Sequence, residues 1–380
     1  MNKSKSIFYN LLLLGLLLSS CAKDESSEAL LNVNSLENST EKEFVTLKSG
    51  FVVEKRGSDF ILEGDIILTP EQLSSLDEKG NIFGEVPENP SPDLKIHPVS
   101  NLPMELYEGE GEVQSRALGI YPTEYNLWAM VRFVYNSNLT AHQRSCIRAA
   151  LQNIEAATNV RFYNATGQPT RDPVYKIDYP YLDFTATGNV SYSQSYVGRI
   201  GGRQQVSLAD FAFTFGPWLT DVIEHEIGHA LGMLHEQSRP DRDSYVNINW
   251  NNLKPMGSSN FNKQTTNYYY VGTYDFTSIM GYSSMTISTD AVYNTSVPMY
   301  TRKDGTHITA GTQFSNNDRM WVNSLYIPYI ARSDTYRELA ATVYKSNNTV
   351  MTAQERLQLQ AQLNNGNPNP PSTGRISNNF

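Results

Sequence analysis

The sequence predicts an α+β fold for residues 117–328 of the 380-residue chain. A strand is indicated over residues 128–134, where apolar side chains gather, and further strand-like runs read NVRFYNA, YLDFTA and VSYSQSYVGR. Helices are expected over 140–157 and 217–231, and an irregular, tyrosine-rich region follows them. Strands and helices mixed in one half, with irregular chain in the other, are typical of an α+β domain.

The helix over 140–157 is indicated by its first turn and by its apolar face. Thr140 and Gln143 have the spacing of a capping box, in which each side chain hydrogen-bonds the backbone of the other residue. The apolar residues that follow share one helical face with Cys146, so a buried, structural thiol is expected there rather than a nucleophile. The second helix is expected to start near Pro217, because proline is favoured in the first turn.

The segments on either side of this domain differ from it in composition. Residues 21–116 begin as a polar tether and then alternate short apolar runs with charges and prolines, so a mostly extended segment without a long helix is expected. Residues 329–380 carry one expected helix, since Thr352 and Glu355 again have capping-box spacing. The final tract, NNGNPNPPSTGRISNNF, has low complexity and is expected to be disordered.

Residues 1–20 have the pattern of a secretory signal peptide. Two lysines precede an apolar run over residues 7–18, which is too short to span a bilayer comfortably. The tetrad LSSC, which ends at Cys21, resembles the lipobox of bacterial lipoproteins, whose cysteine carries a lipid and becomes the new N-terminus. Ordinary cleavage after a small residue, with Cys21 incidental, is the alternative. The lipobox interpretation predicts an exported protein, anchored to the outer membrane or cell surface through Cys21.

Composition restricts the partners and the covalent structure. The net charge is −9 and no basic cluster is present, which argues against a nucleic-acid partner. Cys146 is the only cysteine besides Cys21, so no disulfide is expected within the exported protein. A monomer is expected.

Three of the six histidines lie in the stretch HEIGHALGMLH. On a helix, His225 and His229 are i,i+4 neighbours whose imidazoles project side by side and can bind one Zn²⁺. Glu226 cannot be a third ligand on the same face, but it can reach a zinc-bound water. Gly232 can adopt the left-handed conformation that ends a helix, and the turn returns His235 toward the first two histidines. Three protein nitrogens with an open position are the arrangement of a catalytic zinc site.

The pattern HExxHxxGxxH belongs to the metzincins. The residues that follow it, Glu236 and then QSRPDRDSYV, resemble the astacin family of zinc endopeptidases, and the bacterial, flavastacin-like members are the expected relatives. The stretch YDFTSIMGY resembles the Met-turn of that family. The resemblance implies that Met280 forms an apolar floor below the metal without binding it. It also implies that Tyr282 is a ligand in the resting enzyme and swings away to hydrogen-bond the transition state.

The resemblance covers about residues 117–328 and implies a metzincin fold. Such a fold has a twisted, mostly parallel sheet with an antiparallel edge strand, an active-site helix, an irregular C-terminal half and a zinc cleft between the halves. The stretch VGRIGGRQQVSL looks like the edge strand above the cleft, which can bind an extended substrate by strand addition. The two disulfides usual in the family are absent, so packing must replace them. Position 281 is glycine where histidine is common, and no effect on the metal is expected.

The family's mechanism uses one catalytic Zn²⁺, which activates a water and polarises the scissile carbonyl of a protein or peptide substrate. By the resemblance, Glu226 is the general base and then the acid, and zinc and Tyr282 stabilise the oxyanion. His97, His142 and His307 lie outside these motifs and are expected to be ordinary surface, helix and loop residues.

The upstream stretch FILEGDIILT resembles the F-x-G-D-I element of astacin prosegments, with leucine in place of phenylalanine. The resemblance implies that Asp65 occupies the site of the water on zinc in a latent form, and that Gly64 permits close approach of the backbone. A turn between two strands is the alternative. Arg116-Ala117 looks like a trypsin-type activation site for a second protease. In the family, the freed amine pairs through water with the glutamate after the third histidine, here Glu236.

Two other classes of function stay open beside the protease. One is a surface binding or adhesion lipoprotein with an inactive protease domain. The other is a zinc hydrolase of non-protein amides. Every catalytic position of the family motif is intact, which disfavours the first alternative. Digestion of casein or peptides with and without a chelator separates all three.

Overall fold

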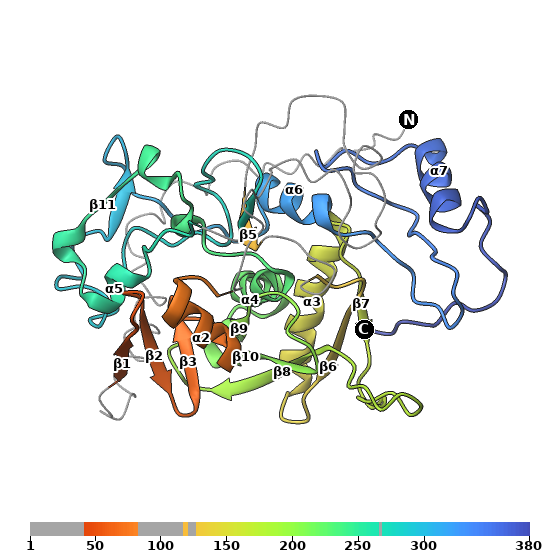
Figure 1. Cartoon of the computed structure of the whole chain (residues 1–380), viewed down its shortest axis with the longest axis horizontal. Helices are drawn as coiled ribbons and strands as arrows, with labels where there is room; N and C mark the ends of the chain where they lie inside the picture. Colours follow the sequence, from red (N-terminus) through yellow and green to blue (C-terminus); the bar gives the residue numbers. More distant parts are fainter. Residues whose placement is uncertain (1–41, 83–116, 121–126, 266–267) are drawn as a thin grey trace, which may run out of the picture.

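The computed structural model describes four stretches of the chain, which are residues 42–82, 117–120, 127–265 and 268–380 (Figure 1). Cys21 and Arg116 lie outside the described residues, as do the signal peptide and His97, so the expectations for them stay predictions. The described part has the α+β architecture that the sequence predicts. None of its helices is long and apolar enough to cross a membrane.

A four-stranded parallel sheet in the order β10-β8-β6-β7 forms the base of the domain (Figure 1). All three pairings in it are parallel, which confirms the expected parallel sheet. Helix α3 connects β6 to β7 as the crossover that two parallel strands require. The elements are β6 (Val131–Tyr135), α3 (Ala141–Ala157), β7 (Phe162–Asn164), β8 (Tyr181–Gly188) and β10 (Arg203–Ala209).

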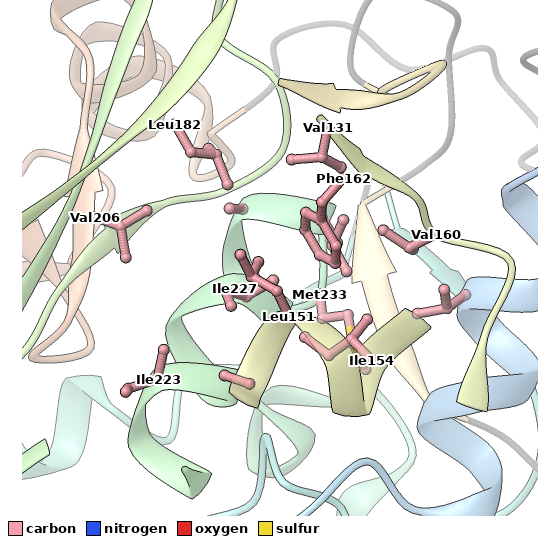
Figure 2. Close-up of a cluster of buried hydrophobic side chains, with 14 of the residues drawn as sticks. Val131, Leu151, Ile154, Val160, Phe162, Leu182, Val206, Ile223, Ile227 and Met233 are labelled. Carbon is pink, nitrogen blue, oxygen red and sulfur yellow. The ribbon is translucent and has the colours of Figure 1, made fainter. Parts of the chain in front are cut away.

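Helices α3 and α4 pack against this sheet and bury the main core. Figure 2 shows Val131 and Leu182 of the sheet together with Leu151 of α3 and Ile227 of α4. All four side chains are fully buried, and burying such a side chain contributes roughly 1.5–3 kcal/mol. The core therefore fixes the position of α4 above the sheet without any disulfide.

The two helices start differently from one another. Helix α3 begins after Thr140 with the predicted capping box, and Cys146 on it is fully buried, as expected. Helix α4 runs from Asp221 to Leu231 and not from Pro217, which lies in the short 3₁₀ helix η3 (Gly216–Trp218).

The C-terminal part of VGRIGGRQQVSL forms β10, which ends the four-stranded sheet but pairs in parallel with β8, so this edge strand is not the expected antiparallel one. The short strand β9 (Ser195–Tyr196) lies just upstream. An isolated antiparallel bridge between Gln194 and Ser207 places the chain before β9 alongside β10. Gly201 and Gly202 have positive φ angles of 86° and 57°, which lets the chain reverse between the two strands.

The N-terminal segment, residues 42–82, adds a small sheet to this edge. Its four strands are antiparallel to one another, and β4 pairs in parallel with β9 through Ile66 with Ser195 and Ile67 with Tyr196. Apolar side chains of the segment pack with Leu118, Val197 and Leu234 of the domain in a second core. The strands are β1 (Glu43–Thr46), β2 (Val52–Arg56), β3 (Asp59–Leu62) and β4 (Ile66–Leu68).

The segment also contains helix α2 (Pro70–Lys79), so the expectation of a mostly extended segment was incomplete. Thr69 and Gln72 form a capping box, proline occupies the first turn, and Gly80 ends the helix in the left-handed conformation. These signals are present in the stretch TPEQLSSLDEKG and were sufficient to predict the helix.

The C-terminal half of the domain is irregular, as predicted. Its strands form two-stranded sheets only, β11 with β13 and β12 with β5 (Leu118–Ile120). Its elements are β11 (Val246–Ile248), α5 (Pro255–Ser259), β12 (Tyr268–Tyr270), β13 (Tyr300–Arg302) and α6 (Asn316–Leu325). Short 3₁₀ helices complete the domain, which are η2 (Asp210–Phe213), η4 (Glu236–Ser238), η5 (Arg242–Ser244) and η6 (Trp250–Asn252).

The C-terminal extension, residues 329–380, contains helix α7 (Ala353–Leu363) where its capping box predicts it. The tail that follows was expected to be disordered, and the structure instead packs it on the sheet. The backbone N–H of Asn164 in edge strand β7 donates to Asn378 Oδ1 at 2.9 Å. The ring of Phe380 stacks on Phe133, with 6.0 Å between ring centroids. An unpaired sheet edge offers backbone donors and acceptors, and the asparagines of the tail satisfy them.

Phe380→Ala should lower stability, because it removes the stacked ring from Phe133. An aromatic pair contributes about 0.5–1.5 kcal/mol beyond its buried area, so the melting temperature should fall by roughly 2–4 °C. Thermal unfolding of the full chain measures this. Ser377→Ala, at an exposed position of the same tail, is the control and should change nothing. Equal melting temperatures for both variants would show that the tail does not pack as described.

Candidate active site

Helix α4 and the turn after it bring three histidines together. His225 and His229 lie one turn apart on α4, and Gly232 ends the helix with a φ of 109° in the left-handed region. The chain then doubles back, and His235 Nε2 lies 3.4 Å from His225 Nε2. The ring of His229 is 4.7 Å from that of His235, centroid to centroid.

The carboxylate of Asp65, from the N-terminal segment, lies among the three rings. Its Oδ2 is 3.2 Å from His235 Nε2 and 3.4 Å from His225 Nε2, and its Oδ1 is 3.7 Å from His229 Nε2. Burial alone would raise the pKa of this carboxyl, but the adjacent histidines hold it well below its usual range.

This donor set fits a metal ion. The four ligand atoms lie within 4.8 Å of one another. His229 Nε2 and Asp65 Oδ1 are buried, and no described residue hydrogen-bonds either atom. Buried polar atoms without partners are costly, and a cation between them would satisfy both. Three imidazole nitrogens and one carboxylate oxygen are a donor set that Zn²⁺ accepts with tetrahedral geometry.

Each histidine is oriented through its second ring nitrogen. His225 Nδ1 lies 2.8 Å from the carbonyl of Ile279, and His229 Nδ1 lies 2.9 Å from that of Met233. Both carbonyls can only accept, so Nδ1 carries the proton and the lone pair of Nε2 faces Asp65. His235 Nδ1 lies 2.7 Å from a carboxylate oxygen of Glu63. Glu63 lies inside the prosegment-like stretch FILEGDIILT, but no local pattern marks it as a partner of a histidine.

Glycine is needed at position 64 for a different reason from the expected one. A Cβ atom at position 64 would meet no other atom within 4 Å, so close backbone approach does not require glycine. Its φ of 93° does require it, because other residues rarely adopt this angle. Glu63 precedes it with a φ of 54°, also in the left-handed region. The two residues together form the turn that directs Asp65 to the histidines.

Glu226 is buried beside Asp65, and no described residue hydrogen-bonds its Oε2. Burial, and then the charge of Asp65, raises the pKa of this carboxyl well above its usual range. A carboxyl with a raised pKa and a free oxygen in a metal site has the properties of a general base.

Tyr282 lies beside the histidines with its ring 4.7 Å from that of His235. Its hydroxyl donates to the carbonyl oxygen of Glu63. Burial, and then the charges of Asp65 and Glu63, raises the pKa of the phenol well above its usual value. In this form the N-terminal segment therefore holds the hydroxyl that is expected to bind the metal in the resting enzyme.

The Met-turn lies under α4. Met280 is buried. A Cβ atom at Gly228 would be 2.7 Å from Met280 Sδ, so only glycine allows this contact. Asp318 of α6 accepts hydrogen bonds from Ser278 Oγ at 2.7 Å and from the backbone N–H of Ile279 at 3.0 Å. Asp318 thereby supports the carbonyl that orients His225, a role that nothing in the local sequence indicates.

The other residues predicted from the sequence lie outside the group of three histidines and Asp65. Glu236 Oε1 accepts from the backbone N–H of Asp275 at 2.7 Å, and burial raises the pKa of this carboxyl to about 8. Its Oε2 is buried, and no described residue hydrogen-bonds it. Ala117 is fully buried at the start of β5. His142 contacts the carbonyl of Phe213, and neither it nor the exposed His307 belongs to the metal-binding group.

Residues 121–327 match the model of the astacin peptidase family over more than half of the chain. The chain belongs to the astacin family. High choriolytic enzyme 2 of Oryzias latipes is 34% identical over 157 residues, which are 41% of this chain and 50% of the relative. Zinc metalloproteinase nas-13 of Caenorhabditis elegans is 33% identical over 206 residues, 53% of this chain and 41% of the relative.

Among solved structures, high choriolytic enzyme 1, a hatching enzyme zinc-protease of Oryzias latipes, is 27% identical to this chain. That likeness covers 51% of this chain and 88% of the other, with a TM-score of 0.40. The chain spans about half the length of the curated astacin relatives it matches.

Asp318→Asn should destabilise the astacin domain. Three donors converge on this carboxylate, from Ser278, Ile279 and Ser315. In one orientation an amide NH₂ would face the two backbone N–H groups, and in the other it would make the Ser278 hydroxyl accept a hydrogen bond instead of donating one. A buried group left without its partner costs about 1–3 kcal/mol, and urea unfolding should show a loss of this size. Asp210→Asn, at an exposed position, is the control. A free energy of unfolding equal to that of the wild type would contradict the role given to Asp318.

Proposed function

We propose that this protein is a zinc-dependent endopeptidase that cuts proteins or peptides outside the cell and is held latent by its N-terminal segment. The observation that carries the proposal is the group of three histidine nitrogens within 4.8 Å of one another and of the Asp65 carboxylate. Several relatives are named zinc metalloproteinases, which supports the same activity.

His225, His229 and His235 would hold the zinc ion. When bound, zinc supplies Lewis-acid activation of the scissile carbonyl and of the attacking water. Glu226 takes the proton of that water on its free Oε2 and delivers it to the nitrogen of the leaving amine. Tyr282, once released from the carbonyl of Glu63, donates a hydrogen bond to the oxyanion that forms on the carbonyl oxygen.

Latency would come from two contacts of the N-terminal segment. Asp65 occupies the position between the histidines where the water would otherwise lie. Strand β4 pairs with the edge strand β9, which a substrate needs if it binds by strand addition. Arg56 strengthens this contact by donating to Gln194 Oε1 at 2.7 Å and to the carbonyl of Gly64 at 2.8 Å.

Activation would follow a cut between Arg116 and Ala117 by another protease. Ala117 is buried at the start of β5, so the new N-terminus would begin inside the domain. The unpaired Oε2 of Glu236 offers an acceptor for the amine that the cut creates. If Cys21 carries a lipid, both the anchor and Asp65 lie upstream of the cut, so activation would also release the catalytic domain from the membrane.

The two alternative functions are weaker. A binding lipoprotein with an inactive domain would not need, beside three converging histidines, a buried Glu226 Oε2 that no described residue hydrogen-bonds, since buried polar atoms without partners cost stability. A hydrolase of non-protein amides would share the metal and the base. Cleavage of casein by the activated protein, abolished by a chelator and restored by zinc, is the outcome that supports a protease.

Glu226→Gln should abolish peptide hydrolysis and leave zinc binding intact, because Glu226 is not among the grouped ligands. Loss of a general base lowers turnover by about 10²–10⁴-fold. Hydrolysis of a fluorogenic peptide and the zinc content of the purified protein measure the two effects. Glu224→Gln is the matched control, since this buried carboxylate of the same helix is bonded to Thr220 and Asn153 instead. Wild-type turnover by Glu226→Gln would refute the mechanism.

The order of Cys21, Asp65 and Arg116 along the chain predicts where each form of the protein is found. Intact chain should fractionate with membranes and carry a lipid on Cys21, and active chain should be free and begin at Ala117. Cell fractionation followed by N-terminal sequencing measures this. An active form that still carries the lipidated cysteine on an unbroken chain would disprove the coupling of activation to release.

A further inference from the structure

His235 differs from the other two histidines in the group that accepts the hydrogen of its Nδ1. The acceptors for His225 and His229 are backbone carbonyls of the catalytic domain itself, at 2.8 and 2.9 Å. The acceptor for His235 is the side-chain carboxylate of Glu63, at 2.7 Å, which belongs to the N-terminal segment. Two metal ligands are therefore oriented by their own domain, and the third is oriented by a segment that activation would remove.

Both the N-terminal segment and the catalytic domain hold Glu63 at His235. The side chain of Glu63 is 1% exposed, and its second oxygen accepts a hydrogen bond from Ser238 Oγ at 3.0 Å. The left-handed turn at Glu63 and Gly64 places Glu63 at Nδ1 of the His235 ring and Asp65 at its Nε2, 3.2 Å away. The segment thus contacts both nitrogens of the same imidazole.

We propose that Glu63 is a positioning residue of the metal site, which makes the latent chain hold zinc more tightly than the chain without its N-terminal segment. The inference rests on the proposed zinc function but is separate from the block by Asp65. Asp65 would touch the metal itself, whereas Glu63 acts through His235. A carboxylate that accepts from Nδ1 fixes the ring and makes the opposite nitrogen a stronger ligand, and its loss typically weakens metal binding about 10–100-fold.

The coupling is reciprocal. If docking of the segment tightens zinc, zinc must tighten docking of the segment by the same factor. The latent chain is then the form that takes up the metal, and the segment both completes the site during loading and closes it to substrate. Removal of the segment leaves Nδ1 of His235 and the hydroxyl of Ser238 without the acceptor that they share here.

Competition between the full, uncleaved chain and a chromophoric zinc chelator tests the proposal without any assay of activity. Glu63→Ala removes the acceptor and should weaken zinc binding about 100-fold, and Glu63→Gln keeps an acceptor oxygen without the charge and should weaken it about 10-fold. Glu43→Ala is the control, because Glu43 is an exposed carboxylate of the same segment that bonds Lys55 and no residue of the histidine site. It should retain near wild-type zinc affinity.

The outcomes separate this inference from the proposed function. A wild-type chain that binds no zinc refutes the proposed function. Stoichiometric zinc in the wild type, with an affinity of Glu63→Ala within twofold of it, overturns only the role of Glu63. An equal loss in Glu43→Ala also overturns it, because the cause would then be a general effect of losing a carboxylate from the segment. If Glu63→Ala does not fold, Glu63→Gln decides, and wild-type affinity in that variant is the overturning result.

Discussion

The arrangement of the catalytic domain depends on one constraint, which is that three imidazole nitrogens must face the same point. A helix supplies two of them at a spacing of four residues, but no helix can supply the third on the same face. The chain must therefore turn back within one helical turn, and Gly232 makes this possible with a φ of 109°. The turn is useful only if α4 cannot shift, and the buried contacts of α4 with α3 and the sheet prevent that.

A buried metal site needs polar partners around it, and these reach far into the chain. The carbonyl of Ile279 orients His225, and Asp318 holds Ile279 from a position 39 residues later in the chain. Met280 fills the space under the helix because Gly228 leaves room for its sulfur. The irregular C-terminal half thus has a definite task. It supplies fixed carbonyls and an apolar floor, which a regular helix or strand, with its carbonyls already bonded, would not offer.

Local sequence signals were enough to predict the features that depend on residues close together in the chain. Capping boxes located α3 and α7, and histidine spacing located the three rings that the fold brings together, because each depends on residues within one or two turns. The edge strand, the packed tail and the roles of Glu63 and Asp318 depend on contacts between residues far apart in the chain, which spacing alone does not reveal. The tail is the clearest case. Its composition indicates disorder, but the open edge of β7 provides partners that composition cannot show.

The described part of the N-terminal segment, residues 42–82, shares its core with the catalytic domain. Its apolar side chains reach a full core only against Leu118, Val197 and Leu234 of the catalytic domain. Docking therefore completes the core of this part of the segment. A polar contact at its centre is tolerable, because Glu63 becomes buried where His235 and Ser238 pair with it. A segment whose buried carboxylate is paired only on the histidine site is sensitive to whether that site is correctly formed.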